Sequence, residues 1–191
     1  MKKMLRPLLV LFALLTVLTG LVYPLLVTGI GKIAFPNQVS GSLVVRDDKV
    51  VGSMLISQSF QDPKYFWGRL SATSPMPNNA SASGGSNFGP TNPALIEAVR
   101  ARIEALKTAD PDNALPIPVD LVTASASGLD PDISPAAALY QVARVARIRH
   151  IDPAKLRERV LAQMKAPLWG IFGESRVNVL MLNLGLDGAR P

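Results

Sequence analysis

The side chains that enzymes use most for acid–base and metal chemistry are nearly missing from this sequence. His150 is the only histidine, and cysteine does not occur. This composition excludes disulfides, thiolate metal sites, cysteine nucleophiles and metal sites built from several histidines. A Ser-His-Asp triad would depend on His150 alone. Because His150 is expected at a helix end beside Arg149, capping of that helix is the simpler explanation for it.

The motifs that bind nucleotides or activate nucleophiles are also absent. Gly84-Gly85 lies in a glycine-rich stretch, but no Gly-Lys-Ser/Thr follows it, so the Walker A pattern fails. There is no Gly-x-Ser-x-Gly elbow and no Ser-x-x-Lys pair. Asp130 and Asp132 stand two apart and could bind a cation, yet a calcium loop needs more acidic ligands. The sequence predicts no catalytic residue, no metal site and no cofactor of its own.

One long apolar stretch, near the N-terminus, precedes the more polar part of the chain in which a functional site could form. No residue from 7 to 31 is charged, and most are Leu, Val, Ile, Ala, Phe or Tyr. A helix over these residues runs roughly 37 Å and can cross a hydrocarbon core of about 30 Å. A cleaved signal peptide would need an apolar region of about 7 to 15 residues and an A-x-A-like site. Neither is present, so we predict an uncleaved transmembrane helix over residues 7–31.

The basic residues around the span predict its orientation. Lys2, Lys3 and Arg6 precede it, whereas Lys32 is the only basic residue close behind it. The positive-inside rule then places residues 1–6 at the cytoplasmic side. The rest of the chain after the span is expected outside the cytoplasm.

Small or kink-forming residues recur every four positions within the span, at Thr16, Gly20, Pro24 and Thr28. On a helix they line one face, and close approach at small residues drives the association of helices in lipid. Pro24 cannot donate an amide hydrogen and crowds the carbonyl of Gly20, so a kink is expected there. We predict that this face packs against a partner helix, although the same spacing also arises in plain anchors.

The remainder of the chain is expected to form one domain. Residues 32–39 are interpreted as a linker, and residues 40–191 are enough for one hydrophobic core. The net charge of +6 falls to +3 without Lys2, Lys3 and Arg6, which is too weak for binding nucleic acid. The predicted fold class is α+β: an N-terminal transmembrane helix followed by a single extracytoplasmic mixed α/β domain.

The expected elements of the domain are a hairpin, three helices and two buried strands. The hairpin covers residues 42–56. Helices are expected to begin after Asn92, Ser134 and Asp152, each followed by a proline, and the second continues to about His150. Strands are expected over 119–126 and 176–186, the latter buried on both faces.

Helical periodicity predicts which side chains of the first two helices face the core. Charged residues such as Arg102 and Arg144 are expected on the outer face. The apolar residues expected on the inner face are Leu95, Ile96, Val99, Ile103, Leu106, Leu139, Val142, Val145 and Ile148.

A long loop without any charge is expected from Ser71 to Asn92. Loops of this length in compact domains usually bind something, and a segment that is desolvated against a partner avoids charges. We therefore predict that this loop docks on a partner protein, through Ser83, Gly84, Gly85, Ser86 and Asn87. The preceding aromatic run, Tyr65-Phe66-Trp67, is interpreted as a satellite hydrophobic cluster.

An ordered set of short segments behind the single span resembles one known family. The segments are Phe66-Trp67-Gly68-Arg69, Ser71-Ala-Thr73, Ser83-Gly-Gly-Ser-Asn87, the run from Pro118 to Pro131, Ile133-Ser-Pro-Ala-Ala137, Val177-Asn178-Val179 and Leu182-Asn183. Together they are similar to the C subunit of the Kdp-type potassium-transporting ATPase over essentially the whole chain. Leu70 stands where that family usually has Pro, and Asp132 where it often has His. The second departure puts any role of that side chain in doubt.

The resemblance implies a non-catalytic accessory subunit of an ATP-driven potassium uptake complex in the bacterial inner (plasma) membrane, which it would assemble or stabilise. Its partners would be a potassium-binding, channel-like A subunit, an ATPase B subunit and a small F subunit. ATP, Mg and potassium would be handled by the complex. The chain has no Asp-Lys-Thr-Gly phosphorylation motif, so it should not hydrolyse ATP by itself.

The family is also described as a catalytic chaperone that raises the ATP affinity of the ATPase subunit, with a glutamine that corresponds to Gln141 proposed to contact the nucleotide. The predicted topology argues against direct contact, because Gln141 would lie across the membrane from ATP. The other interpretation is a glutamine packed or hydrogen-bonded inside the domain. On residues alone, two alternatives from other classes remain: a membrane-tethered extracytoplasmic hydrolase that uses a serine of the Ser-rich loop, and a tethered solute-binding module.

Overall fold

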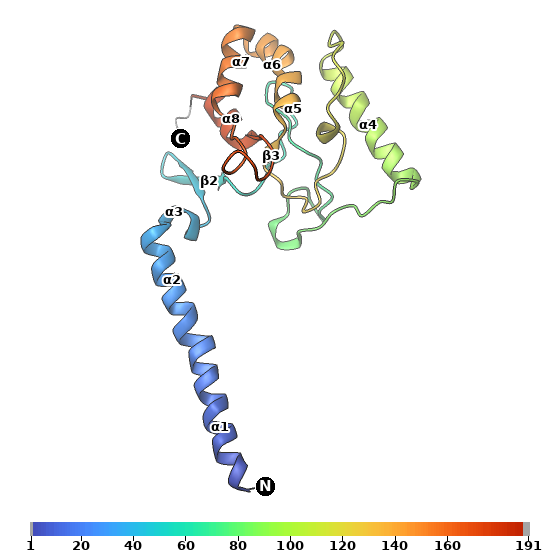
Figure 1. Ribbon diagram of the computed structural model, residues 1–191. Helices are drawn as coiled ribbons and strands as arrows, with labels where there is room; N and C mark the ends of the chain where they lie inside the picture. Colours follow the sequence, from blue (N-terminus) through green and yellow to red (C-terminus); the bar gives the residue numbers. More distant parts are fainter. Residues whose placement is uncertain (1, 189–191) are drawn as a thin grey trace. The chain divides into compact units, whose positions relative to one another are not determined.

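The computed structural model of the chain describes residues 2–188 (Figure 1). The chain divides into two compact units, of which the first ends at Leu43 and the second begins at Val44. The first unit contains the apolar helix and a short helix after it, α3 (Pro36–Val39). The second unit contains the remaining helices and nearly all of the strand residues.

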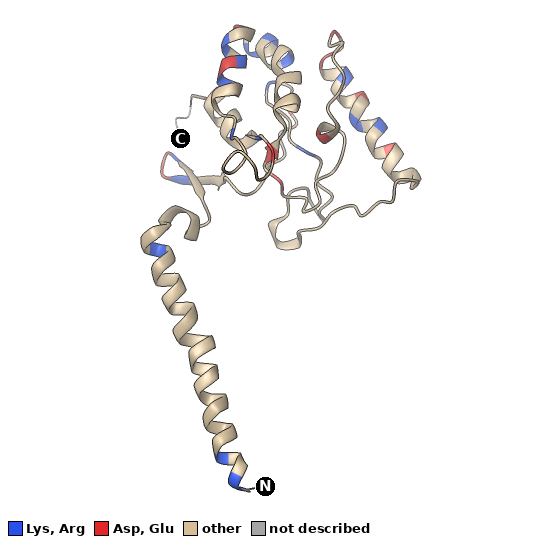
Figure 2. Cartoon of the chain, in the orientation of Figure 1, with Lys and Arg blue, Asp and Glu red and all other residues tan. Residues whose placement is uncertain are grey.

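One long helix makes up most of the first unit. It consists of α1 (Lys2–Val17), the π-helical turn η1 (Leu18–Val22) and α2 (Tyr23–Ala34), which continue one into the next (Figure 1). The stretch Lys3–Ala34 is long and apolar enough to cross a membrane, and none of its described side chains is buried by the chain. Figure 2 shows a long uncharged stretch along it. The helix expected over residues 7–31 is therefore present, and it is longer than expected.

The π-helical turn ends two residues before Pro24. In it the backbone N–H of Tyr23 donates to the carbonyl of Leu18, five residues back instead of four. Pro24 then occupies one of the first two positions of α2, where a missing amide hydrogen costs little. The sequence predicts a kink at Pro24. The structure has a widened, π-helical turn just before this residue.

A short hairpin opens the second unit. Strands β1 (Leu43–Arg46) and β2 (Lys49–Ser53) pair with each other. The two residues between them, Asp47 and Asp48, have φ angles of 49° and 58°. Positive φ at both turn residues gives the twist that a two-residue hairpin needs, and Asp tolerates it better than most residues. The hairpin predicted over residues 42–56 is confirmed, with shorter strands.

Three helices of the second unit begin where their capping residues predicted. Asn92, Ser134 and Asp152 each accept a backbone N–H from the first turn, and a proline follows each of them. The helices and 3₁₀ turns between residues 80 and 162 are η2 (Ala80–Ala82), α4 (Pro93–Ala109), η3 (Val119–Leu121), α5 (Pro135–Tyr140), α6 (Val142–Arg149) and α7 (Pro153–Ala162). The helix expected from 135 to about 150 is therefore interrupted, at Gln141.

The buried strand predicted over 119–126 is wrong. Residues 119–121 form the turn η3, and Ala124 makes only an isolated parallel bridge to Leu70. The apolar residues of this stretch still contribute to the core, because Leu121 is fully buried. Short apolar runs do not distinguish a strand from a buried turn by periodicity.

The central strand predicted over 176–186 is also wrong. The chain forms only the two-residue strand β4 (Val177–Asn178), antiparallel to β3 (Asp132–Ile133), and then helix α8 (Val179–Leu186). Asn178 begins this helix by accepting the N–H of Met181 at 3.1 Å. A run that is apolar on every side fits a buried helix as well as a central strand. The prediction was right only in that the segment is buried.

A hydrophobic cluster joins these helices to an irregular segment that contains Phe66 and Trp67. Both aromatic side chains belong to this main core and not to a satellite cluster. Ile96 and Ile148, expected to face inward, are 45 % and 39 % exposed. The cluster residues with at most 2 % exposure are Phe66, Leu106, Leu121, Ile133, Ala137, Ala138, Val145, Ala146, Leu156, Val160, Val177 and Leu182.

Candidate functional site

Two buried side-chain amides hold the backbone of Phe66 and Trp67. The Oε1 atom of Gln141 accepts the N–H of Trp67 at 2.8 Å, and its Nε2 donates to the carbonyl of Trp67 at 3.0 Å. In the same way, Oδ1 of Asn183 accepts the N–H of Phe66 at 2.8 Å, and Nδ2 of Asn183 donates to the carbonyl of Phe66 at 2.9 Å. Each amide thus supplies the donor and the acceptor that a neighbouring strand would offer. We call residues 62–69, which form no strand, the clamped segment.

Arg144 supplies further donors to the clamped segment. Its Nη1 donates to the carbonyls of Tyr65, at 3.0 Å, and of Pro63, and its Nη2 donates to Oε1 of Gln141 at 2.6 Å. Its guanidinium carbon lies 4.7 Å from the centre of the Trp67 ring. Burial lowers the pKa of Arg144 to about 10. The side chain is 1 % exposed, so its predicted place on the outer face is wrong.

A second arginine contacts the same ring. The guanidinium carbon of Arg102 lies 4.9 Å from the centre of Trp67, and burial lowers the pKa of this arginine. Its Nε donates to the carbonyl of Leu121 at 2.9 Å, and its Nη2 donates to that of Gly68 at 3.0 Å. The outward placement expected for Arg102 is therefore wrong as well. An indole ring and backbone carbonyls that lack strand partners are a favourable environment for a guanidinium, with its five donors and planar face.

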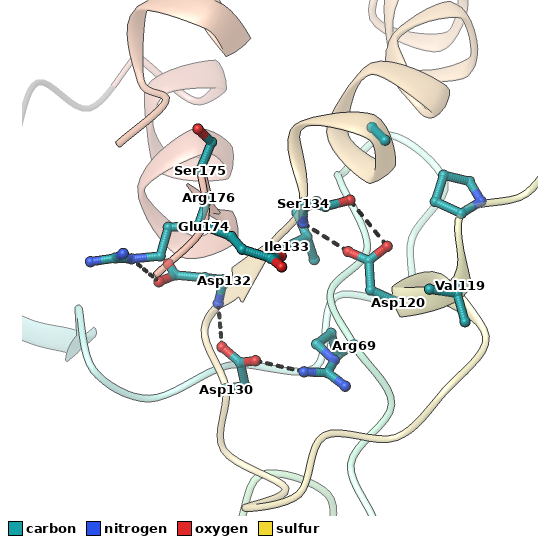
Figure 3. Close-up of a pocket in the computed structure, with 12 residues that line it drawn as sticks. Arg69, Val119, Asp120, Asp130, Asp132, Ile133, Ser134, Glu174, Ser175 and Arg176 are labelled. Atoms are coloured by element: carbon teal, nitrogen blue, oxygen red, sulfur yellow. Dashed lines mark hydrogen bonds and ion pairs between the residues drawn. The ribbon is translucent and has the colours of Figure 1, made fainter. Parts of the chain in front are cut away.

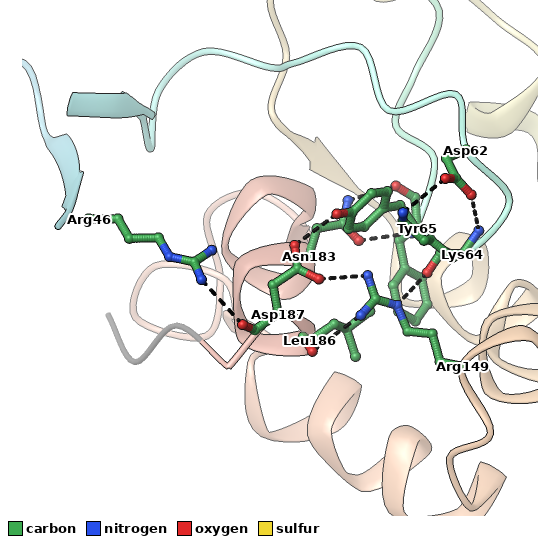
Figure 4. Close-up of polar contacts among 9 residues, drawn as sticks. Arg46, Asp62, Lys64, Tyr65, Arg149, Asn183, Leu186 and Asp187 are labelled. Atoms are coloured by element: carbon green, nitrogen blue, oxygen red, sulfur yellow. Dashed lines mark hydrogen bonds and ion pairs between the residues drawn. The ribbon is translucent and has the colours of Figure 1, made fainter. Parts of the chain in front are cut away.

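Arg149 binds the beginning of the clamped segment (Figure 4). Its Nε donates to the carbonyl of Lys64 at 2.7 Å, and its Nη1 donates to that of Leu186 at 3.2 Å. Its Nη2 donates to Oδ1 of Asp187 at 2.8 Å, while the hydroxyl of Tyr65 donates to Oδ2 at 2.8 Å. The end of α8 is thereby joined to the clamped segment and to the end of α6.

Asp187 is the acceptor at the centre of this group (Figure 4). Partial burial raises the pKa of its carboxyl, but the hydrogen bonds from Arg149 and Tyr65 outweigh burial and hold the pKa below its usual value. The backbone carbonyl of Asp187 also accepts a hydrogen bond from Nη2 of Arg46, at 3.4 Å.

The bonds around Gln141 use all of its hydrogen-bonding capacity. Its Oε1 accepts from Trp67 and Arg144, and its Nε2 donates to the carbonyls of Trp67 and Ala137. A side-chain amide has two donors and two acceptor positions, so none is left for a ligand. The side chain is also 1 % exposed. These contacts agree with the interpretation in which Gln141 is packed and hydrogen-bonded inside the domain.

Acidic side chains gather in a cleft of about 530 Å³ (Figure 3). Arg69 pairs with Asp130 at 3.0 Å, and Arg176 pairs with Asp132 at 3.0 Å. Oδ1 of Asp130 also accepts the N–H of Asp132. Within residues 2–188, no group of three His, Cys, Asp or Glu side chains is arranged to hold a metal ion. These contacts of the two aspartates are thus with arginines and with the local turn.

The glycines of the uncharged loop pack against the backbone of the same domain. The N–H of Gly84 and the hydroxyl of Ser83 donate to the carbonyl of Ser127, at 2.9 Å and 3.0 Å. A Cβ atom added at Gly85 would lie 2.8 Å from the carbonyl oxygen of Ala126. A side chain at Gly85 would therefore displace backbone, and this close approach explains the glycine.

Other polar groups of this loop are bonded within the domain too. The hydroxyl oxygen of Ser71 accepts the N–H of Asn78 at 2.9 Å, and the hydroxyl donates to the carbonyl of Gly128 at 2.7 Å. Ser86 is half-buried and Asn87 is exposed. Contacts within the domain thus explain the small and polar residues of the loop. Docking of the loop on a partner stays a prediction.

The small-residue face of the long helix is open in the chain by itself. Thr16, Gly20, Pro24 and Thr28 are all exposed, and nothing lies within 4 Å of a Cβ placed at Gly20. The π-helical turn holds more residues per turn than the 3.6 of an α-helix. Residues four apart therefore stay closer to one face across this turn than they would in a regular helix.

His150 ends α6, as its position predicted. It has φ 55° and ψ 40°, the left-handed conformation common after the last turn, and its N–H bonds back into the helix. Its side chain is exposed.

Most of the side chains that hold the clamped segment were not predicted from the sequence. Helical periodicity treats every arginine as a surface residue, so it misplaced Arg102 and Arg144. One available signal was Asn183, a polar residue inside an apolar run. A second was the spacing of three between Gln141 and Arg144, which puts both on one helix face.

Comparison with known proteins identifies the family. The family model described as "KdpC: K+-transporting ATPase, c chain" matches residues 5–188. A protein of Dechloromonas aromatica (strain RCB) named potassium-transporting ATPase KdpC subunit is 65% identical over 187 residues, which cover 98% of each chain. The protein of the same name from Variovorax paradoxus (strain S110) is 65% identical over 189 residues, 99% of this chain and 98% of the relative. That from Polaromonas naphthalenivorans (strain CJ2) is 62% identical over 191 residues, 100% and 97% of the two chains. The chain therefore belongs to the KdpC family of potassium-transporting ATPase subunits.

Proposed function

We propose that this chain is a non-catalytic accessory subunit of an ATP-driven potassium uptake complex, which it helps to assemble or stabilise. The observation that carries the proposal is the match to the KdpC family over residues 5–188. The contacts of the buried polar side chains support the proposal. Gln141, Arg144 and Asn183 form their hydrogen bonds within the domain and hold the clamped segment. ATP, Mg and potassium are then handled by the other subunits.

The proposed partners are a channel-like A subunit that binds potassium, an ATPase B subunit and a small F subunit. The chain would cross a bacterial inner membrane once, with its N-terminus in the cytoplasm and its domain outside. The asymmetry of basic residues supports this orientation, since Lys2, Lys3 and Arg6 precede the span and Lys32 alone follows closely.

Any effect of this chain on the ATP affinity of the ATPase subunit is proposed to be indirect. Gln141 is buried and its amide is fully bonded, so a nucleotide would reach it only after the clamped segment had moved away. We propose that the folded domain acts on nucleotide binding through its contacts with the other subunits.

Two matched substitutions test this proposal in the assembled complex. Gln141→Glu removes the donors to the carbonyls of Trp67 and Ala137, and Asn183→Asp removes the donor to Phe66. Both should lower the stability of the domain and weaken ATP binding in proportion to that loss. The measurements are thermal unfolding and the dissociation constant of ATP, with the complex lacking this chain as the reference.

Direct contact would give a different result. Gln141→Glu would then weaken ATP binding far more than Asn183→Asp at an equal loss of stability. A complex that assembles fully and binds ATP unchanged without this chain would contradict the accessory role itself.

A further inference from the structure

A second hairpin, which we call the apolar hairpin, extends over residues 165–176. Lys165 and Arg176 exchange two backbone hydrogen bonds at its base, at 2.8 Å and 3.0 Å. Leu168 and Phe172 exchange two more nearer the tip, at 2.9 Å and 3.0 Å. These paired bonds join the two arms of the hairpin as isolated antiparallel bridges, so the tip is held in a defined turn.

The tip of this hairpin exposes four large apolar side chains. Leu168 is 60 %, Trp169 81 %, Ile171 78 % and Phe172 61 % exposed. No residue from 166 to 173 is charged. The rings of Trp169 and Phe172 contact each other edge to face, with centres 6.1 Å apart. Contiguous apolar surface of this kind is rare on soluble domains and indicates an interaction with a membrane or a protein.

We infer that the apolar hairpin inserts its tip into the interface of the bilayer that holds the chain's own transmembrane helix. The inference rests on the membrane anchorage in the proposed function, and it does not depend on potassium transport. Only residues 35–43 separate the end of α2 from the second unit. Nine residues span at most roughly 30 Å, which limits how far the start of the second unit can lie from the end of α2.

The composition of the hairpin favours lipid as its occupant. Tryptophan and other aromatic residues are enriched where a chain meets the headgroup region, because the rings are apolar and the indole N–H can still find a polar partner. The nearest charged residues, Lys165 and Glu174, stand directly before and after the uncharged run, so they lie outside the tip.

The exposure of the tip favours lipid as well. The four side chains of this one turn are each at least 60 % exposed, so a protein would need a matching pocket to cover all of them. Lipid chains adapt to such a surface without a preformed cavity, and the binding energy grows with the apolar area that they bury.

The distribution of tryptophan makes this inference directly testable in the full chain. The chain has only two tryptophans, and none lies in the transmembrane helix. Trp67 is 6 % exposed within the core, whereas Trp169 is 81 % exposed at the tip. The difference in emission between the unaltered chain and Trp169→Phe therefore reports the tip alone.

The experiment places the full chain in lipid nanodiscs made with either ordinary or acyl-brominated phospholipid. Bromine should quench the emission of Trp169, and iodide added to the solution should quench it little. Ile171→Asp should remove the quenching by bromine, because a buried carboxylate is costly in lipid. The control Leu115→Asp changes an exposed apolar residue outside the hairpin, 60 % exposed, and should leave the quenching unchanged.

Two outcomes would overturn the inference. Emission that brominated lipid leaves unchanged but iodide quenches would place the tip in water. Quenching by neither agent in the complex assembled with the other subunits would place the tip against protein. Failure of the chain to enter nanodiscs would count against the membrane anchorage instead, so the two failures are distinguishable.

Discussion

At the scale of single residues, the main feature of this domain is that two side-chain amides form the backbone hydrogen bonds that a neighbouring strand would otherwise form. Buried backbone N–H and C=O groups need partners, and the clamped segment has no neighbouring strand to provide them. Gln141 and Asn183 supply paired bonds to two successive residues, and Arg144, Arg149 and Arg102 bind carbonyls on either side. The polar side chains in this core therefore do what backbone pairing does elsewhere.

Arg144 should be the arginine whose loss costs the domain most. Arg144→Met keeps much of the volume but removes the donor to the carbonyls of Tyr65 and Pro63 and to the buried Oε1 of Gln141. We expect a loss of about 2–4 kcal/mol in the free energy of unfolding. The measurement is urea unfolding followed by Trp67 emission in the Trp169→Phe background.

Arg100→Met is the matched control for this change, because Arg100 is exposed on α4. It should shift the unfolding midpoint little. Equal shifts for the two variants would mean that the bonds of Arg144 add nothing beyond its charge.

Asp187 should make stability depend on pH in the acid range. The pKa of its carboxyl is lowered in the folded chain, so its stabilising bonds are fully present above the unfolded pKa of about 4 and are lost as pH falls through the folded value. Asp187→Asn should cost about 1 kcal/mol at neutral pH, since the pair with Arg149 is partly screened by water.

The difference between the Asp187→Asn variant and the unaltered chain should shrink as the pH falls below the unfolded pKa and through the lower folded pKa of Asp187. Thermal unfolding at a series of pH values measures it. Asp48→Asn serves as the control, because Asp48 is exposed in a turn with φ 58° that Asn also tolerates. A difference that stays constant until the acid unfolding of the chain would contradict the role given to the carboxylate.

At the scale of elements, local signals predicted boundaries well and predicted buried segments poorly. The caps at Asn92, Ser134 and Asp152 and the Asp47-Asp48 turn act within a few residues, so the sequence itself carries the information. The segment 176–186 is apolar all round, and whether it becomes helix or strand depends on what surrounds it. The clamped segment could not be predicted as such, because its partners lie far along the chain.

The uncharged loop gives a matched pair of glycine substitutions. A Cβ at Gly85 would press on the carbonyl of Ala126, whereas one at Gly84 meets nothing within 4 Å. Gly85→Ala should therefore lower the free energy of unfolding by about 1–3 kcal/mol, and Gly84→Ala should change it little. Urea unfolding of both variants measures the difference. Equal stability of the two would mean that the loop does not rest on the domain as described.

The orientation of the whole molecule in the membrane is open to a reporter experiment. A reporter that is active only outside the cytoplasm, fused after residue 191, should be active. The reason is the greater number of basic residues before the span than after it. An inactive reporter, together with an active cytoplasmic reporter at the same position, would reverse the proposed orientation and bring the domain to the side of ATP.

Assembly should depend on the small-residue face of the long helix. Gly20→Leu fills space that is open in the chain alone, so the helix itself should tolerate it while a neighbouring helix is pushed away. We expect fewer partner subunits to copurify with this variant in detergent. Gly29→Leu, at an equally open position outside the four-residue series, is the control. A full complement of subunits with Gly20→Leu would show that this face is not an interface.

The distance along the chain between the clamped segment and its partners sets the order of events during synthesis. Trp67 is bonded by a side chain 74 positions later, and Phe66 by one 117 positions later. At about 5–20 residues per second, the ribosome takes on the order of ten seconds to deliver that last partner. The apolar helix is made first and can enter the bilayer during this interval, while Phe66 and Trp67 remain uncovered. A nascent chain that stops short of Asn183 would therefore be inserted but unable to close its core, and it would be a substrate for quality-control proteases.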